Sequence, residues 1–212
     1  MNLPRYMTKR TFLVAVVIAI VVVGVGSMAW GHASDGDDRA PVTYLSASWA
    51  KSYPTLGSLF EAADLVVVGT VRGVAGTKED TVAAGAQRSS LRFTNFEIAV
   101  GRVISPDVSE SRVSAGAAIL IHQTGGVGDD GRRVELTDDP LLVEGTTYLM
   151  FLQYNDGFDT YTVLGGPQGR MIVAGDMVTS LSRTYPGRAI QDLGLVDFPL
   201  ADIGQQSAAR SD

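Results

Sequence analysis

The stretch GVGDDG, residues 126–131, has the glycine spacing of a nucleotide-binding loop and follows the strand-like run AAILIH. Such a loop must lead into a helix, because amides at the helix N-terminus bind the phosphates. Here it leads into RRVELTDDP, which is short, charged and ended by Pro140. Asp129 and Asp130 would also place negative charges beside the phosphates. We therefore predict a mobile loop between two strands, with no nucleotide bound.

The acidic residues at positions 129, 130, 138 and 139 are a second group that could do chemistry, since carboxylates suit hard cations. Their spacing matches no EF-hand loop, and acidic loops are usually only solvated. Calcium binding by residues 129–139 stays an open question. The two histidines are His32 and His122, and the chain has no cysteine, which leaves too few ligands for a multi-histidine or thiolate metal site. We predict no metal ion and no cofactor.

Catalytic groups are equally sparse. His122 could act as a base with Glu135 or Asp138, although a lone histidine in a strand is more often structural. The stretch SWAK at 48–51 fits the Ser-x-x-Lys pattern of penicillin-interacting enzymes, but no Lys-Thr-Gly or Ser-Asp-Asn follows. The Gly-x-Ser-x-Gly turn of many hydrolases is absent. We assign no catalytic residue and predict that the protein is not an enzyme.

Aromatic side chains gather in one part of the chain and could form a binding face: Tyr148, Phe151, Tyr154, Phe158 and Tyr161. Their alternation is also what the wall of a β-barrel would show. We interpret them as wall residues.

The N-terminus carries the clearest targeting signal. Arg5, Lys9 and Arg10 precede a run in which no charged residue occurs until Asp35, and residues 12–25 include eleven Phe, Leu, Val or Ile. Those residues favour insertion into a bilayer by about 3 to 7 kcal/mol. We favour an uncleaved transmembrane anchor. The alternative is a secretory signal, for which Ser-Met-Ala and Gly-His-Ala offer cleavage sites after the apolar run.

Both interpretations place the rest of the chain outside the membrane, since the cationic flank stays in the cytoplasm. The whole chain has a formal charge of −6, so without its three N-terminal cations the exported part carries −9. Nucleic acid is therefore a poor partner, because phosphate binding needs a basic surface. The adjacent cations of the exported part are limited to Arg132 and Arg133.

The exported part begins with a polar stretch, read as a linker, and then one short amphipathic helix. In PTLGSLFEAAD, the apolar residues recur at helical spacing: Leu56, Leu59, Phe60 and Ala63. The period then changes to that of strands. LVVVGTVRGV predicts a buried strand with a bulge or bend at Gly69.

A polar, glycine-rich excursion is expected over residues 75–90, followed by the alternating strand LRFTNFEIAVGRVI, bent at Gly101. AAILIHQ predicts a third strand. TYLMFLQYNDGFDTYTV predicts a hairpin, because Asn, Asp and Gly accept a positive φ. GRMIVAGDMVTSL predicts another, with its turn at residues 174–176.

The predicted fold is mainly β: a small closed barrel of the OB type with one or two short helices, and a two-sheet sandwich is the alternative. The predicted organisation is a cytoplasmic n-region at 1–10, an anchor or signal at 11–30, a linker at 31–54, the barrel domain at 55–182 and a tail at 183–212 that could add a short helix.

The order of segments AADLVVVGTV, TNFEIAVGRVI, AILIHQTGG and EGTTYLMFLQYNDGFDTYTV resembles that of the netrin-like domain. This OB-type barrel is shared by tissue inhibitors of metalloproteinases and netrin C-terminal modules, and small exported bacterial proteins of unknown role are similar. The resemblance covers residues 59–163 and implies the fold. It does not carry the inhibitory activity, which needs an N-terminal cysteine that this chain lacks.

These observations predict an extracytoplasmic binding module, anchored to the membrane through residues 11–30 or secreted after signal cleavage. A protein or glycan outside the membrane would contact the loops expected at 75–90 and 124–140. The alternatives are an envelope hydrolase with a site built from those loops, and a purely structural envelope protein. Neither nucleic acid nor nucleotide is an expected partner.

Overall fold

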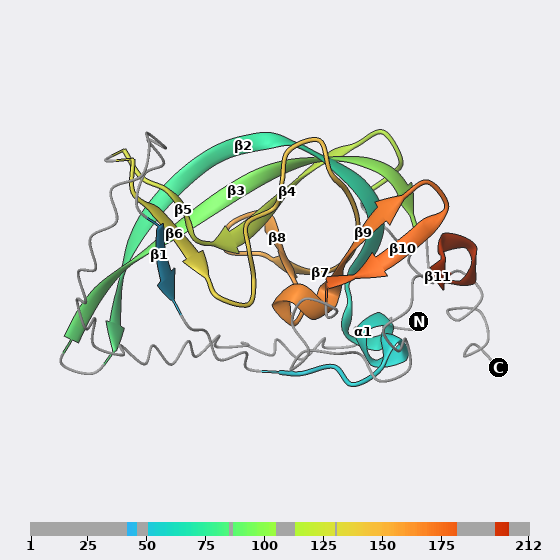
Figure 1. Cartoon of the computed structure of the whole chain (residues 1–212), viewed down its shortest axis with the longest axis horizontal. Coiled ribbons are helices and arrows are strands. Elements are labelled where there is room, and N and C mark those ends of the chain that lie inside the picture. The colour runs from blue at the N-terminus through green and yellow to red at the C-terminus, as the bar shows by residue number, and fades with distance from the viewer. Residues whose placement is uncertain are drawn as a thin grey trace, which may run out of the picture.

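The computed structural model describes residues 42–45, 51–84, 87–104, 113–129, 131–181 and 198–203. They form a mainly β structure with a closed five-strand barrel and few helices (Figure 1). The prediction of a mainly β chain built around a closed barrel is confirmed. The predicted membrane or signal segment at 11–30 lies outside the described residues, as does most of the tail at 183–212. No helix within the described ranges is long and apolar enough to span a bilayer.

The barrel is a ring of five strands: β2 (Leu65–Ala84), β3 (Gln87–Val103), β4 (Ala118–Thr124), β7 (Thr147–Asn155) and β8 (Thr160–Val163). Around the ring their order is β2, β3, β4, β8, β7 and back to β2. The ring pairings are antiparallel except that of β4 with β8, which is parallel and joins Ile121 to Tyr161. A closed ring satisfies backbone hydrogen bonds without an exposed sheet edge.

Strand β7 divides one of its edges between two partners. Its C-terminal part pairs with β8, and its N-terminal part pairs with β9 (Arg170–Ala174). The sheet continues through β10 (Met177–Ser180) to β11 (Phe198–Pro199). The turn predicted between β9 and β10 is confirmed, with Gly175 at φ 60.

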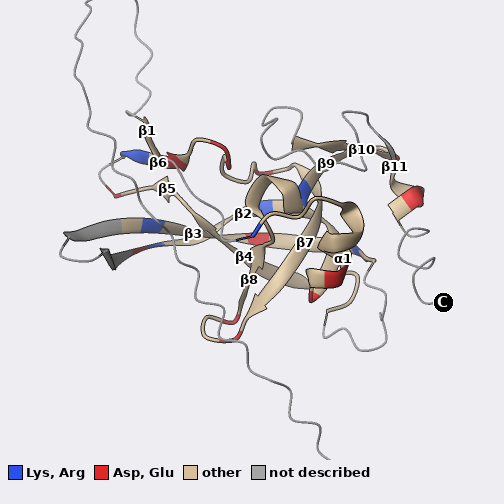
Figure 2. Cartoon of the chain, turned by 90° about the horizontal axis from the view of Figure 1, so that it is seen from below, with Lys and Arg blue, Asp and Glu red and all other residues tan. Residues whose placement is uncertain are grey.

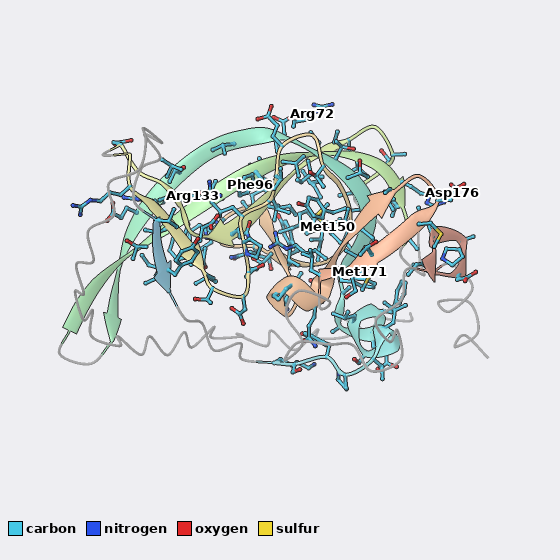
Figure 3. All side chains as sticks on the ribbon, viewed as in Figure 1. Arg72, Phe96, Arg133, Met150, Met171 and Asp176 are labelled. Atoms are coloured by element: carbon cyan, nitrogen blue, oxygen red, sulfur yellow. The ribbon has the colours of Figure 1, made fainter. Side chains whose placement is uncertain are left out.

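Two apolar cores lie on opposite sides of the barrel wall. The inner core fills the barrel and includes Val67, Ile98, Ile121 and Met150, each no more than 1% exposed, and Met150 lies within the ring in Figure 3. The outer core lies on the far side of β2, β7 and β9, so residues on both sides of these strands are apolar. The near-continuous apolar run LVVV follows from burial on both faces.

Helix α1 (Leu56–Ala62) covers the outer core. Thr55 caps its N-terminus by accepting from the Ser58 amide, and the Ser58 hydroxyl accepts from the Thr55 amide in return. Phe60 packs edge-on against Phe151 of β7, with ring centroids 4.9 Å apart. The predicted helix and its apolar face are therefore confirmed. The 3₁₀ helix η1 (Gly166–Gly169) lies between β8 and β9.

The two predicted glycine bends are parts of one β-bulge. Gly69 pairs with Val100 and Val68 pairs with Arg102, so Gly101 is the extra residue on β3. A Cβ atom at Gly69 would lie 2.5 Å from Ile98 Cγ2, which explains why this position is glycine. The bulge increases the local twist that closes a small barrel.

The excursion predicted over residues 75–90 is wrong. β2 and β3 continue through this region as a two-stranded arm that leaves the barrel (Figure 1), and Ala84 pairs with Gln87 at its end. Thr77, Lys78 and Glu79 are exposed. Because consecutive residues of β2 are exposed here, this part of the strand needs no apolar alternation and its sequence resembles that of a loop.

A second, three-stranded sheet lies beside the base of this arm. Its order is β1 (Val42–Leu45), β6 (Arg133–Leu136) and β5 (Gly126–Val127), with β1 parallel to β6. Arg92 of β3 donates to the Arg132 carbonyl at 2.9 Å and so links the arm to this sheet. We call β1, β6 and β5 the small sheet.

The range 31–54, predicted as a linker, is attached to the domain at two described points. Strand β1 forms one edge of the small sheet. Further along, the amide of Tyr53 donates to Gln168 Oε1, and Gln168 Nε2 donates to the Tyr53 carbonyl, both at 3.1 Å. This reciprocal pair holds the chain on η1 just before α1 begins.

Candidate functional site

Within GVGDDG, Gly126 and Val127 form strand β5, and Gly128 and Gly131 lie in the connection to β6. The Gly128 amide donates to the Arg132 carbonyl, and the Gly131 amide donates to the Gly128 carbonyl, both at 2.9 Å. Strand β6 follows in place of a helix, so there are no helical amides here to bind a phosphate. The interpretation as a turn between strands is confirmed, and the loop is a short hairpin.

The acidic residues near this hairpin that the structure describes do not form one cluster. Asp129 is exposed, while Asp139 is 5% exposed and forms an ion pair with Arg170. Asp130 lies outside the described residues. Among the residues that the structure covers, no group of three or more His, Asp or Glu side chains could hold a metal ion.

The ion pair of Asp139 and Arg170 closes one end of the barrel. Arg170 Nη2 lies 2.8 Å from Asp139 Oδ1, and the two side chains are 2% and 7% exposed. Arg170 also donates to the Pro140 carbonyl, which accepts a second hydrogen bond from Gln123 Nε2 at 2.9 Å. Gln123 Oε1 accepts from the Leu142 amide at 3.0 Å. The cluster thereby fixes the connection between β6 and β7 onto the barrel.

Burial raises the pKa of Asp139, while the positive charge of Arg170 and a hydrogen bond from Gln123 lower it. Because both charged groups are almost fully covered, neither can meet a ligand from solvent. We interpret this cluster as structural.

His122 lies on the outer face of the barrel, and its ring is held by neighbours. It stacks on Phe93 of β3 with centroids 4.8 Å apart and planes at 21°. Its Nδ1 atom lies 2.8 Å from Asn95 Oδ1. Of the acids considered as its partner, Glu135 is paired with Arg133, and Asp138 lies after β6. The contacts of His122 are thus those of a positioned surface residue.

A third ring completes this stack. Phe158, from the turn between β7 and β8, lies parallel to His122 with centroids 5.9 Å apart and planes at 3°. The ammonium group of Lys78, on β2, lies 5.7 Å from the Phe158 ring centroid. Phe158 is nevertheless 58% exposed. We call Lys78, Phe93, Asn95, His122 and Phe158 the aromatic face.

The turn that carries Phe158 is fastened at several points. The Phe158 amide donates to the Asn155 carbonyl at 3.2 Å, and the Gly157 amide donates to Asn155 Oδ1 at 3.3 Å. The Tyr154 hydroxyl donates to Asp159 Oδ1 at 2.6 Å. The hairpin prediction is confirmed, but the positive φ, 50°, falls on Asp159 and not on Gly157.

A positive φ accompanies this arrangement. Among the described residues, Asp159 is the one non-glycine residue with a positive φ. Aspartate tolerates this conformation in tight turns better than most residues do. Phe158 therefore lies in a turn whose flanking residues, Asn155 and Asp159, are both hydrogen-bonded.

The predicted aromatic group separates into three environments. Tyr148 and Phe151 are 4% and 0% exposed, as expected for wall residues. Tyr154 and Tyr161 pack against each other with centroids 5.2 Å apart. Only Phe158 of this group joins the aromatic face, and its partners Phe93 and Lys78 were not anticipated. One signal was present: Phe93 falls on the polar side of an alternating strand.

The aromatic face combines three kinds of interaction. The aromatic rings stack on one another, Asn95 Oδ1 and His122 Nδ1 lie within hydrogen-bond distance of each other, and Lys78 adds a positive charge. Side chains with these properties fit a ligand that is apolar on its faces and polar at its edge. Compared with protein-family models, with curated proteins and with solved structures, the chain matches none of them.

Proposed function

We propose that the chain is a membrane-anchored, extracytoplasmic binding module that holds a glycan on its aromatic face, and that it is not an enzyme. The observation that carries this proposal is Phe158, which is 58% exposed and is held by stacking on His122 and by a hydrogen-bonded turn. An exposed ring whose orientation is set by its neighbours can meet the flat face of a ligand with little further loss of side-chain freedom.

The fold supports this proposal through the position of the aromatic face. The ring order, with one parallel pairing between β4 and β8, supports an OB-type barrel. Barrels of this type bind oligosaccharides and oligonucleotides on their second and third strands, beside the loops after the first and fourth. Here those are β3, β4, the β2–β3 arm and the β7–β8 turn. The closer resemblance to netrin-like domains remains a prediction.

A glycan fits better than the other ligands of such barrels. The exported part carries a formal charge of −9, which disfavours nucleic acid. A sugar ring offers C–H faces for the aromatic rings and hydroxyl groups for Asn95 and His122. The predicted location outside the membrane would also expose the chain to envelope glycans.

The test is calorimetric titration of the purified chain with neutral and uronic-acid-containing oligosaccharides. We expect one class to bind, and Phe158→Ala to weaken binding by about 5- to 30-fold, the equivalent of ~1 to 2 kcal/mol. Val143→Ala is the matched control, because Val143 is also 58% exposed but lies outside the aromatic face. Equal affinities of both variants would contradict the proposed site.

The same oligosaccharides test the absence of catalysis. Incubation with the chain should leave their reducing ends unchanged. Turnover that is abolished by His122→Ala would replace the binding proposal with the hydrolase alternative.

A further inference from the structure

The small sheet exposes a row of apolar side chains beside a cation. Val42 and Val127 both pair with Arg133, from opposite sides. Paired residues of neighbouring strands point to the same face, so these three side chains form a row across the sheet. Val42 is 38% exposed and Val127 is 52% exposed. Figure 3 shows Arg133 at the end of the molecule far from α1.

Tyr44 adds a further exposed side chain to this face, along strand β1 from Val42. It lies two residues beyond Val42 on β1, so it points to the same face, and it is 63% exposed. We call Val42, Tyr44, Val127 and Arg133 the small-sheet face. Large apolar side chains that are exposed together on one sheet face are typical of a contact surface.

The chain length before β1 limits where this face can lie. The predicted membrane segment ends at residue 30, and β1 begins at Val42. The eleven residues between them, 31–41, span at most about 36 to 40 Å when fully extended. A linker that ran unattached to residue 54 would reach about twice as far. Because β1 pairs with β6, the small sheet is the part of the domain that this short stretch of chain connects to the predicted membrane segment.

The residue types of the small-sheet face suit a bilayer surface. Tyrosine is enriched where lipid headgroups meet hydrocarbon, and arginine binds phosphate groups. Figure 2 shows both cationic and anionic residues along β6, and Glu135 is indeed paired with Arg133. Because this pairing offsets charge, apolar contact by Tyr44 and the valines must provide most of the attraction.

We propose that the small-sheet face rests on the phospholipid headgroup layer of the membrane that anchors the chain. This inference rests on the anchor in the proposed function and adds an orientation to it. The domain then does not tumble freely on its tether, since β1 and β5 hold one end of it against the bilayer. Another occupant of this face would be a second copy of the chain, which the experiment below distinguishes.

The chain has no cysteine, so single spin labels can be placed without removing native thiols. The full chain is reconstituted in phosphatidylcholine vesicles, with and without phosphatidylglycerol, and nitroxides are attached at Tyr44→Cys and Val127→Cys. Control labels are placed at Val143→Cys and Met177→Cys, which replace residues that are 58% and 41% exposed away from the small sheet. Accessibility to oxygen, which concentrates in lipid, is compared with accessibility to a water-soluble nickel chelate.

We expect oxygen to be favoured at positions 44 and 127 and the nickel chelate to be favoured at 143 and 177. Flotation of the vesicles tests the anchor separately. If the chain floats but all four labels favour nickel, the anchor stands and the proposed contact is overturned. If the chain does not float, the anchor itself fails and the inference fails with it. Dipolar broadening between labels at position 44 would assign the face to a second copy instead, which also overturns the proposal.

Discussion

Replacement of Arg170 by methionine tests whether the buried ion pair holds the barrel end together. The Arg170→Met variant keeps an unbranched stem but leaves Asp139 without its cation, in a site where the two native side chains are 2% and 7% exposed. Breaking a buried pair by removing one partner costs about 3 to 5 kcal/mol. For a chain of this size we expect the melting temperature to fall by about 6 to 20 °C.

The pH dependence of this loss identifies its cause. Burial already raises the pKa of Asp139 above its ordinary value of 3.8, and removing Arg170 takes away the main opposing effect. The folded state then favours the neutral carboxyl more strongly than the unfolded state does. The stabilisation that comes from this preference is fully present below pH 3.8, and it is lost as the pH rises through the raised pKa of Asp139 in the folded state. The free energy of unfolding of Arg170→Met should therefore be only slightly below that of the native chain near pH 4, and the difference should grow toward pH 7.

The assay is urea unfolding, followed by circular dichroism, at several pH values between these limits. The double variant Arg170→Met/Asp139→Asn serves as the control, because a neutral amide at position 139 needs no cation. We expect it to recover most of the loss at pH 7. If Arg170→Met lowers the free energy of unfolding at pH 7 by less than about 1 kcal/mol, the buried pair stabilises the fold no more than a surface ion pair does, and this reasoning is refuted.

Two further predictions, the first with a control variant, test other parts of the fold. Gly69→Ala should lower the free energy of unfolding by about 1 to 3 kcal/mol, because the added methyl group would lie 2.5 Å from Ile98 Cγ2. Gly76→Ala is the control, because a methyl group there would have no atom within 4 Å. Its free energy of unfolding, measured in urea, should stay within about 0.5 kcal/mol of that of the native chain. Gln168→Leu leaves the Tyr53 amide and carbonyl unpaired and should cost about 1 to 3 kcal/mol, and unchanged hydrogen exchange at Tyr53 would contradict the reciprocal bonding.

Local patterns predicted most of the barrel strands. The hairpin at NDG depends on residues close together in the chain, and the glycines at 69 and 101 each indicate a bend within an apolar run; the structure contains both features. The arm is not predicted because the consecutive exposed residues 74–79 of β2 show no apolar alternation. Strand β1 was missed because its partner β6 lies some 90 residues away, and four residues carry too little pattern.

The candidate site depends on tertiary contacts that no local pattern encodes. Phe93, His122 and Phe158 come from two strands and a turn, and their stacking follows only once the ring has closed. Asp139 is one of several acidic residues in its segment, and its sequence neighbours do not show that it is buried against Arg170. The sequence could therefore indicate a barrel, but not the surface that would bind a ligand.

The regular pairing of β2 and β3 in the arm would allow the arm to be lengthened or shortened by insertion or deletion of residues. Residues 77–84 pair one to one with residues 94–87, and no register shift occurs beyond Gly76. Adding or deleting matched pairs at the tip would leave every remaining side chain on its present side of the ribbon. Evolution or a protein engineer could thus lengthen or trim this projection, or graft an epitope onto it, while the barrel and its bulges stay untouched.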